Sequence, residues 1–240
     1  SIRRYGAHGT SHRFVAGEMC KILGKTEGTK IITCHLGNGS SISAVKDGKV
    51  IDTSMGITPL DGLEMGTRCG SIDPAIVTFI MEQEGYTPSE MSDFMNKECG
   101  LLGVSGLSSD CRDLGEAILA GHKRAKLAED ILTYQIKKYI GSYAAAMGGL
   151  DAVVFTAGIG ENRDEIRAAA CEGLEFLGIK IDPVVNEQTH QQSNNVRIST
   201  DDSKYAIGFT ADGQAVIGKP SVKVSMTNIS RAGSPIEIDQ

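Results

Sequence analysis

Two glycines and two hydroxyls follow a histidine at the end of a short apolar run, in the segment IITCHLGNGSSIS at residues 31–43. Gly37 and Gly39 would let the backbone approach a ligand closely and turn its N–H groups outward, which is the geometry that a phosphate needs. The Asn38-Gly39 pair is also the strongest two-residue signal for a hairpin turn, so taken alone this segment favours a turn. The interpretation as a phosphate site depends on what other segments contribute.

Three further glycine-bearing segments lie near predicted strands, at residues 6–12, 66–70 and 157–162. Four such loops with charged or hydrogen-bonding residues suggest the floor of a cleft that meets a polyanion. In the second of the three, Arg68 stands among small residues, and a fixed guanidinium suits the equatorial oxygens of a phosphoryl group in transfer. The alternative is a surface arginine paired with Asp61 or Asp73.

His8 and His12 lie four residues apart in HGTSH. On a helix this spacing could hold zinc, but no glutamate follows the first histidine and no third ligand is evident. We therefore predict that His12 is a surface histidine at the start of a helix. For His8, a ligand-facing role and a structural role both remain open.

Two segments in the second half of the chain could line a nucleotide. Asp110 and Arg112 bracket Cys111, where an N-cap cluster for the following helix competes with a binding role. Residues 158–162 form a loose nucleotide turn, but acidic residues at its end would repel a phosphate. This turn is therefore expected to face the base or the ribose.

The elements that must position these residues alternate between helix and strand, with a hairpin near the start. This pattern predicts an α/β domain with a mixed sheet. We expect strands at 31–36, 41–45, 50–51, 151–156 and 196–199, and helices at 11–23 with Ser11 as N-cap, 74–83, 89–97 with Ser89 as N-cap, 122–147, and from an Asn162 cap onward. Residues 56–74 and 100–113 are expected to be loops, and the residues beyond Lys204 to be two strands or poorly ordered.

Composition restricts the classes of function. The 240 residues carry a net charge of −6, which provides no basic face for nucleic acid. No apolar run approaches the roughly 20 residues that span a bilayer. Six cysteines occur singly, as expected for free thiols in a reducing cytoplasm, so we predict a cytoplasmic protein.

Five ordered segments carry a family resemblance: YGAHGTSH, HLGNGSS, DTSMGITPLDGLEMGTRCGSIDP, GVSGLSSDCRD and FTAGIGEN. From about Arg3 to Lys204 they resemble the C-terminal half of the acetate kinase (acetokinase) family. The resemblance implies a ribonuclease H-like fold of the actin–Hsp70–sugar kinase type, with residues 1–204 as a nucleotide-binding, dimerising domain and 205–240 as a divergent tail. It also implies reversible phosphoryl transfer from ATP to acetate, giving acetyl phosphate and ADP, with Mg²⁺ as cofactor and a homodimer as the assembly.

The same resemblance implies roles for individual residues. His8 and Arg68 would stabilise the phosphoryl group in transfer. The ATP phosphates would be held by His35, Leu36, Gly37, Asn38 and Gly39, and the nucleotide pocket lined by Asp110, Cys111, Arg112, Gly158, Ile159, Gly160, Glu161 and Asn162. No metal ligand is assigned, because Thr210-Ala211-Asp212 is a weak match to the glutamate that the family uses near its end.

The sequence also departs from the family pattern. It starts at a point that matches the middle of the family's chain, so we expect the N-terminal half to be missing. That half would supply an asparagine near the metal, an arginine for the acetate carboxylate and a catalytic aspartate, so residues 1–240 alone should bind ATP weakly and turn over poorly. Ala7 and Cys69 replace the usual motif residues. A propionate kinase and a non-catalytic nucleotide-binding remnant are the alternatives.

Overall fold

The structure, a computed structural model, describes residues 2–189 and 196–203 and the backbone of 206–210. Its centre is a five-stranded sheet with the order β3-β2-β1-β4-β5. The strands are β1 (Lys30–Leu36), β2 (Ser40–Lys46), β3 (Lys49–Thr53), β4 (Ala152–Thr156) and β5 (Ala206–Thr210). The first three pair antiparallel, whereas β4 pairs parallel with both β1 and β5. The predicted α/β class with a mixed sheet is therefore confirmed.

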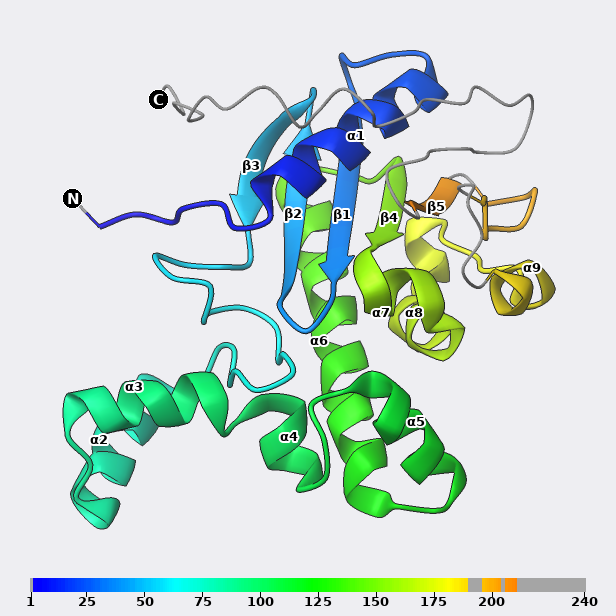
Figure 1. The fold of residues 1–240 in the computed structure, drawn as a ribbon. Coiled ribbons are helices and arrows are strands. Elements are labelled where there is room, and N and C mark those ends of the chain that lie inside the picture. Colours follow the sequence, from blue (N-terminus) through cyan, green and yellow to red (C-terminus); the bar gives the residue numbers. More distant parts are fainter. Residues whose placement is uncertain (1, 190–195, 204–205, 211–240) are drawn as a thin grey trace, which may run out of the picture.

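Helices cover both faces of this sheet (Figure 1). Helix α1 (Gly9–Leu23) crosses one face, and the long α6 (Lys123–Met147) runs along the other. The remaining helices are α2 (Pro74–Glu84), α3 (Pro88–Lys97), α4 (Gly100–Ser105), α5 (Cys111–Leu119), α7 (Ala157–Asn162), α8 (Asp164–Cys171), a 3-10 turn (Glu175–Leu177) and α9 (Pro183–Gln188). Glycines in the left-handed conformation follow α1 and α6, as expected for helix ends.

The core has one part on each side of the sheet, because successive strand residues point to opposite faces. Ile32, Cys34 and Leu36 of β1 pack into the larger part, with α6 and α8. Ile31 packs into the smaller part, against Val15 of α1. Toward the carboxyl end of β1, the α1-facing positions are polar, so the sheet surface under the start of α1 is hydrogen-bonded and carries the candidate site.

Helices α2 and α3 stand away from the sheet (Figure 1). Helix α2 begins at Pro74, as predicted, and Asp73 is its N-cap. The predicted Ser89 cap of α3 is wrong. The helix begins one residue earlier, at Pro88, and Thr87 forms a capping box with Glu90.

Three other boundary predictions are also wrong. Helix α1 begins at Gly9, because His8 adopts a left-handed conformation (φ 58°) and forms the N-cap without a side-chain bond. Asn162 caps no helix; its amide donates to the Gly158 oxygen, and α8 starts after Arg163. The predicted strand at 196–199 is reduced to one isolated bridge, from Ser199 to Ile181.

The segment at 100–113, expected to be a loop, contains α4 and the start of α5. Its glycine- and serine-rich composition predicted a loop where α4 lies. The first N–H groups of α4 bind oxygens of the long loop between β3 and α2, residues 54–73: Leu101 donates to Met65 and Leu102 to Gly66. Beyond Lys204, one strand is described, at 206–210, whereas Ala211 and Asp212 lie outside the described residues. Within the described ranges, no helix is long and apolar enough to cross a membrane.

Candidate active site

The carboxyl ends of β1 and β4 bring two of the glycine segments together. The strands are parallel neighbours, with His35 opposite Thr156, and each continues into a glycine-rich segment. A methyl group on Gly37 would lie 3.8 Å from the Ala157 Cβ, so the 37–39 loop borders the start of α7. Ligands of α/β sheets bind beyond this edge, where the strands end.

His8, which precedes the 37–39 loop in the sequence, and Arg68, which follows it, both lie beside this loop. A Cβ atom placed on Gly39 would lie 3.2 Å from Arg68 Nη1 and 3.6 Å from His8 Nε2. The imidazole comes from the residue before α1, and the guanidinium from the long loop before α2. Three segments far apart in sequence therefore present a histidine nitrogen, an arginine nitrogen and a glycine backbone to one small space.

A close approach between Gly66 and Asn38 links this space to the start of α5. A Cβ atom on Gly66 would lie 1.7 Å from Asn38 Oδ1 and 3.2 Å from the Ser109 oxygen, so a side chain at this position would have to displace the Asn38 amide. The Gly66 N–H also donates to the Asn38 oxygen over 3.1 Å. The 37–39 loop, the long loop and the segment before Asp110 therefore form one continuous rim.

A chain of hydrogen bonds leads from the sheet to His8. His12 Nδ1 lies 2.7 Å from Thr33 Oγ1, His12 Nε2 lies 2.7 Å from Ser41 Oγ, and Ser41 Oγ lies 2.8 Å from His8 Nδ1. The imidazole of His35 stacks on that of His8, with 4.0 Å between ring centroids, and its Nδ1 meets Ser11 Oγ at 2.9 Å. Because Nδ1 of His8 is bonded to Ser41, its Nε2, which faces Gly39, is the nitrogen that remains available to a ligand.

Burial keeps these imidazoles uncharged. It lowers the pKa of His12 to about 3 and that of His35 to about 4, with smaller contributions from the neighbouring imidazoles. The pKa of His8 is also lowered, first by burial and then by the Arg68 charge. A neutral imidazole has one donor and one acceptor nitrogen. The nitrogen that carries the proton on each ring therefore sets the donor-to-acceptor direction of the hydrogen-bond chain.

The prediction of a surface position for His12 is wrong: the residue is 1% exposed. Both ring nitrogens are bonded to hydroxyls of strands that follow it by 21 and 29 residues. Local sequence does not contain those partners, which is why spacing alone suggested a solvent-exposed residue. The position of Ser41 between His8 and His12 likewise depends on the fold, because no local pattern predicts it.

Arg68 is held by neutral groups. Its Nη1 donates to the Pro59 oxygen over 3.0 Å and contacts Met65 Sδ at 3.5 Å. Within the described part of the chain it forms no ion pair, so the alternative of a surface arginine paired with Asp61 or Asp73 is wrong. Its positive charge therefore remains available to an anion.

Asp110 and Arg112 form the N-cap cluster that the sequence offered as one alternative. Asp110 accepts from the Arg112 N–H over 2.8 Å and pairs with the Arg112 guanidinium, which lowers the pKa of Asp110 to about 2. The Arg112 side chain is largely exposed. Between them, burial raises the pKa of the Cys111 thiol to about 12, so this thiol is not a nucleophile near neutral pH.

Helix α7 contains the predicted nucleotide turn, Gly158 to Asn162, and starts under backbone strain. Ala157 has φ 66°, and with His8 it is one of three non-glycine residues with positive φ in the described chain, the third being Asp47 in the hairpin. Glu161 turns back to accept from the Ala157 N–H over 3.0 Å. Its carboxylate thus caps its own helix. Such strain often marks functional sites.

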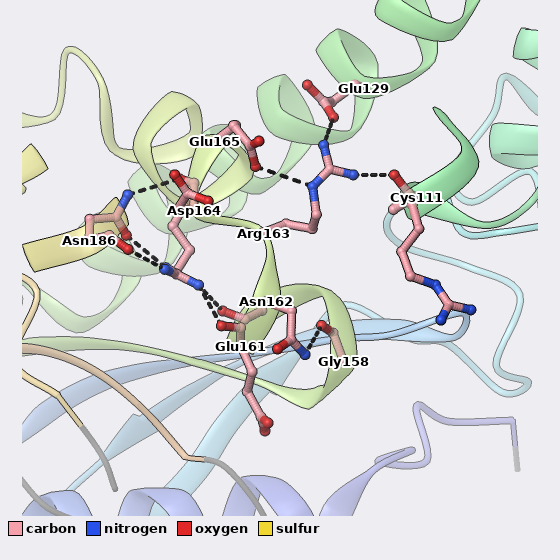
Figure 2. Close-up of polar contacts among 12 residues, drawn as sticks. Cys111, Glu129, Gly158, Glu161, Asn162, Arg163, Asp164, Glu165 and Asn186 are labelled. Carbon is pink, nitrogen blue, oxygen red and sulfur yellow. Dashed lines mark hydrogen bonds and ion pairs between the residues drawn. The ribbon is translucent and has the colours of Figure 1, made fainter. Parts of the chain in front are cut away.

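Two arginines that the sequence pattern did not single out, Arg163 and Arg167, hold this helix in place, and Figure 2 shows the contacts of Arg163. Arg167 is fully buried and donates to the oxygens of Gly160 and Glu161 over 3.0 and 2.9 Å. Arg163 donates to the Cys111 oxygen and so connects α7 to the start of α5. An arginine directly after a nucleotide turn is the signal that could have drawn attention to it.

Among the described residues, no group of three or more His, Cys, Asp or Glu side chains is placed to coordinate a metal ion. Mg²⁺ in kinase sites is bound through one or two carboxylates plus substrate phosphates.

A mixed sheet with glycine turns at the ends of two parallel strands is the half-domain architecture of the actin, Hsp70 and sugar kinase class. The solved acetate kinase of Porphyromonas gingivalis superimposes with a TM-score of 0.84 at 50% identity, over 87% of this chain and 52% of that one. A solved propionate kinase of Francisella tularensis gives 0.79 at 43% identity, over 88% and 53%. The predicted fold type is confirmed.

The particular family follows from the sequence match. The acetokinase family model matches residues 1–217, and the chain belongs to this family. An acetate kinase of Phocaeicola vulgatus is 56% identical over 225 residues, which is 93% of this chain and 56% of that relative. The chain thus spans about half the length of the relatives that it matches.

Proposed function

We propose that this chain is the nucleotide-binding part of an acetate kinase, which transfers the γ-phosphoryl group of ATP to acetate and runs the reverse reaction. The domain would include residues 1–204 together with β5, which pairs with β4 in the central sheet, and the divergent tail would follow β5. The observation that carries the proposal is the convergence of His8 Nε2 and Arg68 Nη1 on one position beside Gly39. Family membership supports the same reaction.

In the forward direction an acetate oxygen forms a bond to the γ-phosphorus, the bond to the β,γ-bridging oxygen breaks, and its electron pair leaves with ADP. Charge spreads over the equatorial oxygens of the phosphoryl group in the transition state. Arg68 would bind these oxygens with its guanidinium, and His8 would donate from Nε2. Both act by position and charge, and neither forms a covalent intermediate.

The hydrogen-bond chain can supply this donor. If the Thr33 hydroxyl donates to His12 Nδ1, His12 Nε2–H donates to Ser41, and the Ser41 hydroxyl donates to His8 Nδ1, then the proton of His8 is on Nε2. The reverse order would present a bare acceptor to the phosphoryl oxygens. The first order is the one that transfer requires, because an anion is stabilised by a donor.

The nucleotide would lie along the rim described above. The 35–39 segment would hold the phosphates through the backbone around Gly37 and Gly39, with His35 supporting His8 by stacking. The walls of the nucleoside pocket would be residues 110–112 and 158–162. When bound with ATP, Mg²⁺ would neutralise phosphate charge.

A propionate kinase is the second candidate, because a propionate kinase structure matches the chain at a TM-score of 0.79. The two reactions share all the groups described here and differ in the size of the acyl pocket. Comparing kcat/KM for acetate and propionate distinguishes them. A non-catalytic nucleotide-binding remnant would give neither activity.

The experiment uses a completed kinase, in which the part of the Phocaeicola vulgatus relative that this chain does not match precedes residue 1. Acetyl phosphate formed from ATP and acetate is trapped as a hydroxamate. We expect transfer in the completed kinase and a loss of about a hundredfold or more in kcat for Arg68→Ala and for His8→Ala. Unchanged transfer in both variants would refute the proposed site.

We also propose a cytoplasmic homodimer. Its support is α2, which has no buried residue and exposes Ile76 and Phe79 at 43% and 61%. An exposed apolar helix face of this kind is typical of a protein contact. The six cysteines all carry free thiols, as in a reducing compartment. Sedimentation of the wild type and of Phe79→Glu tests the dimer, which the charged side chain should dissociate.

A further inference from the structure

Arg163, the single residue between α7 and α8, contacts three other parts of the domain (Figure 2). Its Nη2 donates to Glu129 Oε2 of α6 over 2.7 Å, and its Nε donates to Glu165 Oε2 over 3.2 Å. Its Nη1 donates to the main-chain oxygen of Cys111, in the first turn of α5. One guanidinium therefore uses all three of its nitrogens.

These contacts differ in their shielding from water. The side chains of Arg163 and Glu129 are 13% and 14% exposed, whereas that of Glu165 is 61% exposed. Charge-assisted hydrogen bonds are strongest where water is excluded. The bonds to Glu129 and Cys111 are therefore the ones that hold the guanidinium, and α6 is the fixed element behind it.

The guanidinium also lies directly on α5. A Cβ atom on Gly115 would be 3.3 Å from Arg163 Nη2 and 3.4 Å from its Cζ, so the helix backbone leaves just enough room for the planar group. Gly115 follows Cys111 by four residues, one helical turn. Helix α5 thus meets the same side chain at two successive turns, which fixes both its position and its direction.

The two segments that Arg163 joins are the two proposed walls of the nucleoside pocket. Asp110, Cys111 and Arg112 form one wall, and residues 158–162, which end directly before Arg163, form the other. Among the described residues, the Arg163 guanidinium links the second wall to the first through its bond to the Cys111 oxygen.

We propose that Arg163 is a positioning residue that, with Glu129, fixes the separation of the two pocket walls and thereby sets the affinity for the nucleoside portion of ATP and ADP. The inference rests on the proposed function, because that proposal identifies the two segments as nucleotide-binding. Arg163 itself does not touch the nucleotide. It acts through Cys111 and through the helix that precedes it.

The test separates positioning from stability. Arg163→Met alone would leave Glu129 buried without its partner, which can unfold the domain. The informative variant is Arg163→Met combined with Glu129→Met, because replacing a buried ion pair by apolar side chains of similar volume is often neutral for stability. The matched control is Arg13→Met, the same substitution at an exposed position of α1.

In the double variant we expect the denaturant midpoint to stay close to that of the wild type. Amide hydrogens of residues 111–115 and 158–162 should exchange about tenfold faster, and ADP should bind to the chain about tenfold more weakly by calorimetry, since one tie between the walls is lost. Exchange in β1, β2 and β4 should not change. Arg13→Met should leave all of these measurements unchanged.

The inference fails if the double variant retains wild-type exchange in both walls and wild-type ADP affinity. It also fails if exchange rises equally in the walls and in the central strands, because Arg163 would then contribute only to global stability. If the wild-type chain binds no ADP at all, the proposed function fails instead. The two failures are therefore distinguishable.

Discussion

His8, His12 and His35 share one polar patch under the start of α1, and all three are neutral near pH 7. Burial, and after it the neighbouring imidazoles, lowers the pKa of His12 and of His35, so a charged ring would be costly in this cluster. The positive charge of the site comes instead from Arg68. This division suits phosphoryl transfer, since one fixed cation and one neutral donor stabilise an anion without repelling each other.

The Ser41 hydroxyl is the atom on which the orientation of His8 depends. Ser41→Ala removes the 2.8 Å contact to His8 Nδ1 and the 2.7 Å contact to His12. In the completed kinase we expect kcat to fall about tenfold to a hundredfold with KM for ATP little changed, because a reacting group loses its alignment. Steady-state kinetics measures both parameters.

Ser43→Ala is the matched control, because Ser43 is two positions along the same strand and its hydroxyl donates to Thr53 Oγ1. It should leave kcat unchanged. Equal losses in the two variants would show that the hydroxyls matter for the strand rather than for His8.

Glu64 gives a prediction about stability. The residue is 2% exposed, and neither carboxylate oxygen has a hydrogen-bond partner among the described groups. Burial raises its pKa from 4.5 to about 8. The folded state thus holds a proton that the unfolded state releases, so the free energy of unfolding falls as pH rises between these two values, by up to roughly 1.4 kcal/mol per pH unit.

Glu64→Gln removes this titration, so the variant should gain stability over the wild type as pH rises through that window. Denaturant unfolding at several pH values measures the difference. Glu27→Gln, at an exposed position, is the control and should leave the pH dependence unchanged. A parallel pH dependence in wild type and Glu64→Gln would contradict the neutral buried acid.

At the scale of elements, the site is built where strands end. Strand β4 could be predicted because it is a short, almost entirely apolar run, and β1 because it starts with two buried isoleucines, while glycines mark where each strand turns. The position of the site at these ends could therefore be anticipated. Burial of His12 and the helix at 100–105 could not, because both depend on partners that are distant in the sequence.

The loop at 37–39 carries a prediction of its own. A Cβ on Gly39 would enter the space between Arg68 Nη1 and His8 Nε2, 3.2 and 3.6 Å away. Gly39→Ala should therefore lower kcat of the completed kinase about a hundredfold, because the reacting group is displaced, while leaving the unfolding midpoint nearly unchanged. Steady-state kinetics and thermal unfolding of the same sample test the fall in kcat and the unchanged unfolding midpoint, respectively.

Gly17→Ala is the control for this substitution. A Cβ there meets no atom within 4 Å, and the position is inside α1. Alanine should stabilise the helix by about 0.5–1 kcal/mol without affecting turnover. If Gly39→Ala keeps full activity, the space beside Gly39 does not hold the reacting group.

At the scale of the whole molecule, the described residues form one side of a transfer site. On the proposed function, they would provide a cation, a neutral donor and a glycine loop for phosphate, and a pair of walls for the nucleoside. They provide no cluster of metal ligands. Arg68 is the cation that the described residues place beside Gly39. If it neutralises the phosphoryl group, the carboxylate of acetate needs a second binding group.

This imbalance predicts the behaviour of residues 1–240 in isolation. The chain spans 56% of the Phocaeicola vulgatus relative, so the groups for acetate are expected in the remaining part. We expect the chain to bind ADP detectably by calorimetry but to form acetyl phosphate at least about a thousandfold more slowly than the completed kinase, since each missing electrostatic group costs about a hundredfold to a thousandfold. Hydroxamate trapping compares the two proteins at equal concentration. A full rate from residues 1–240 would show that the described half holds every group that transfer needs.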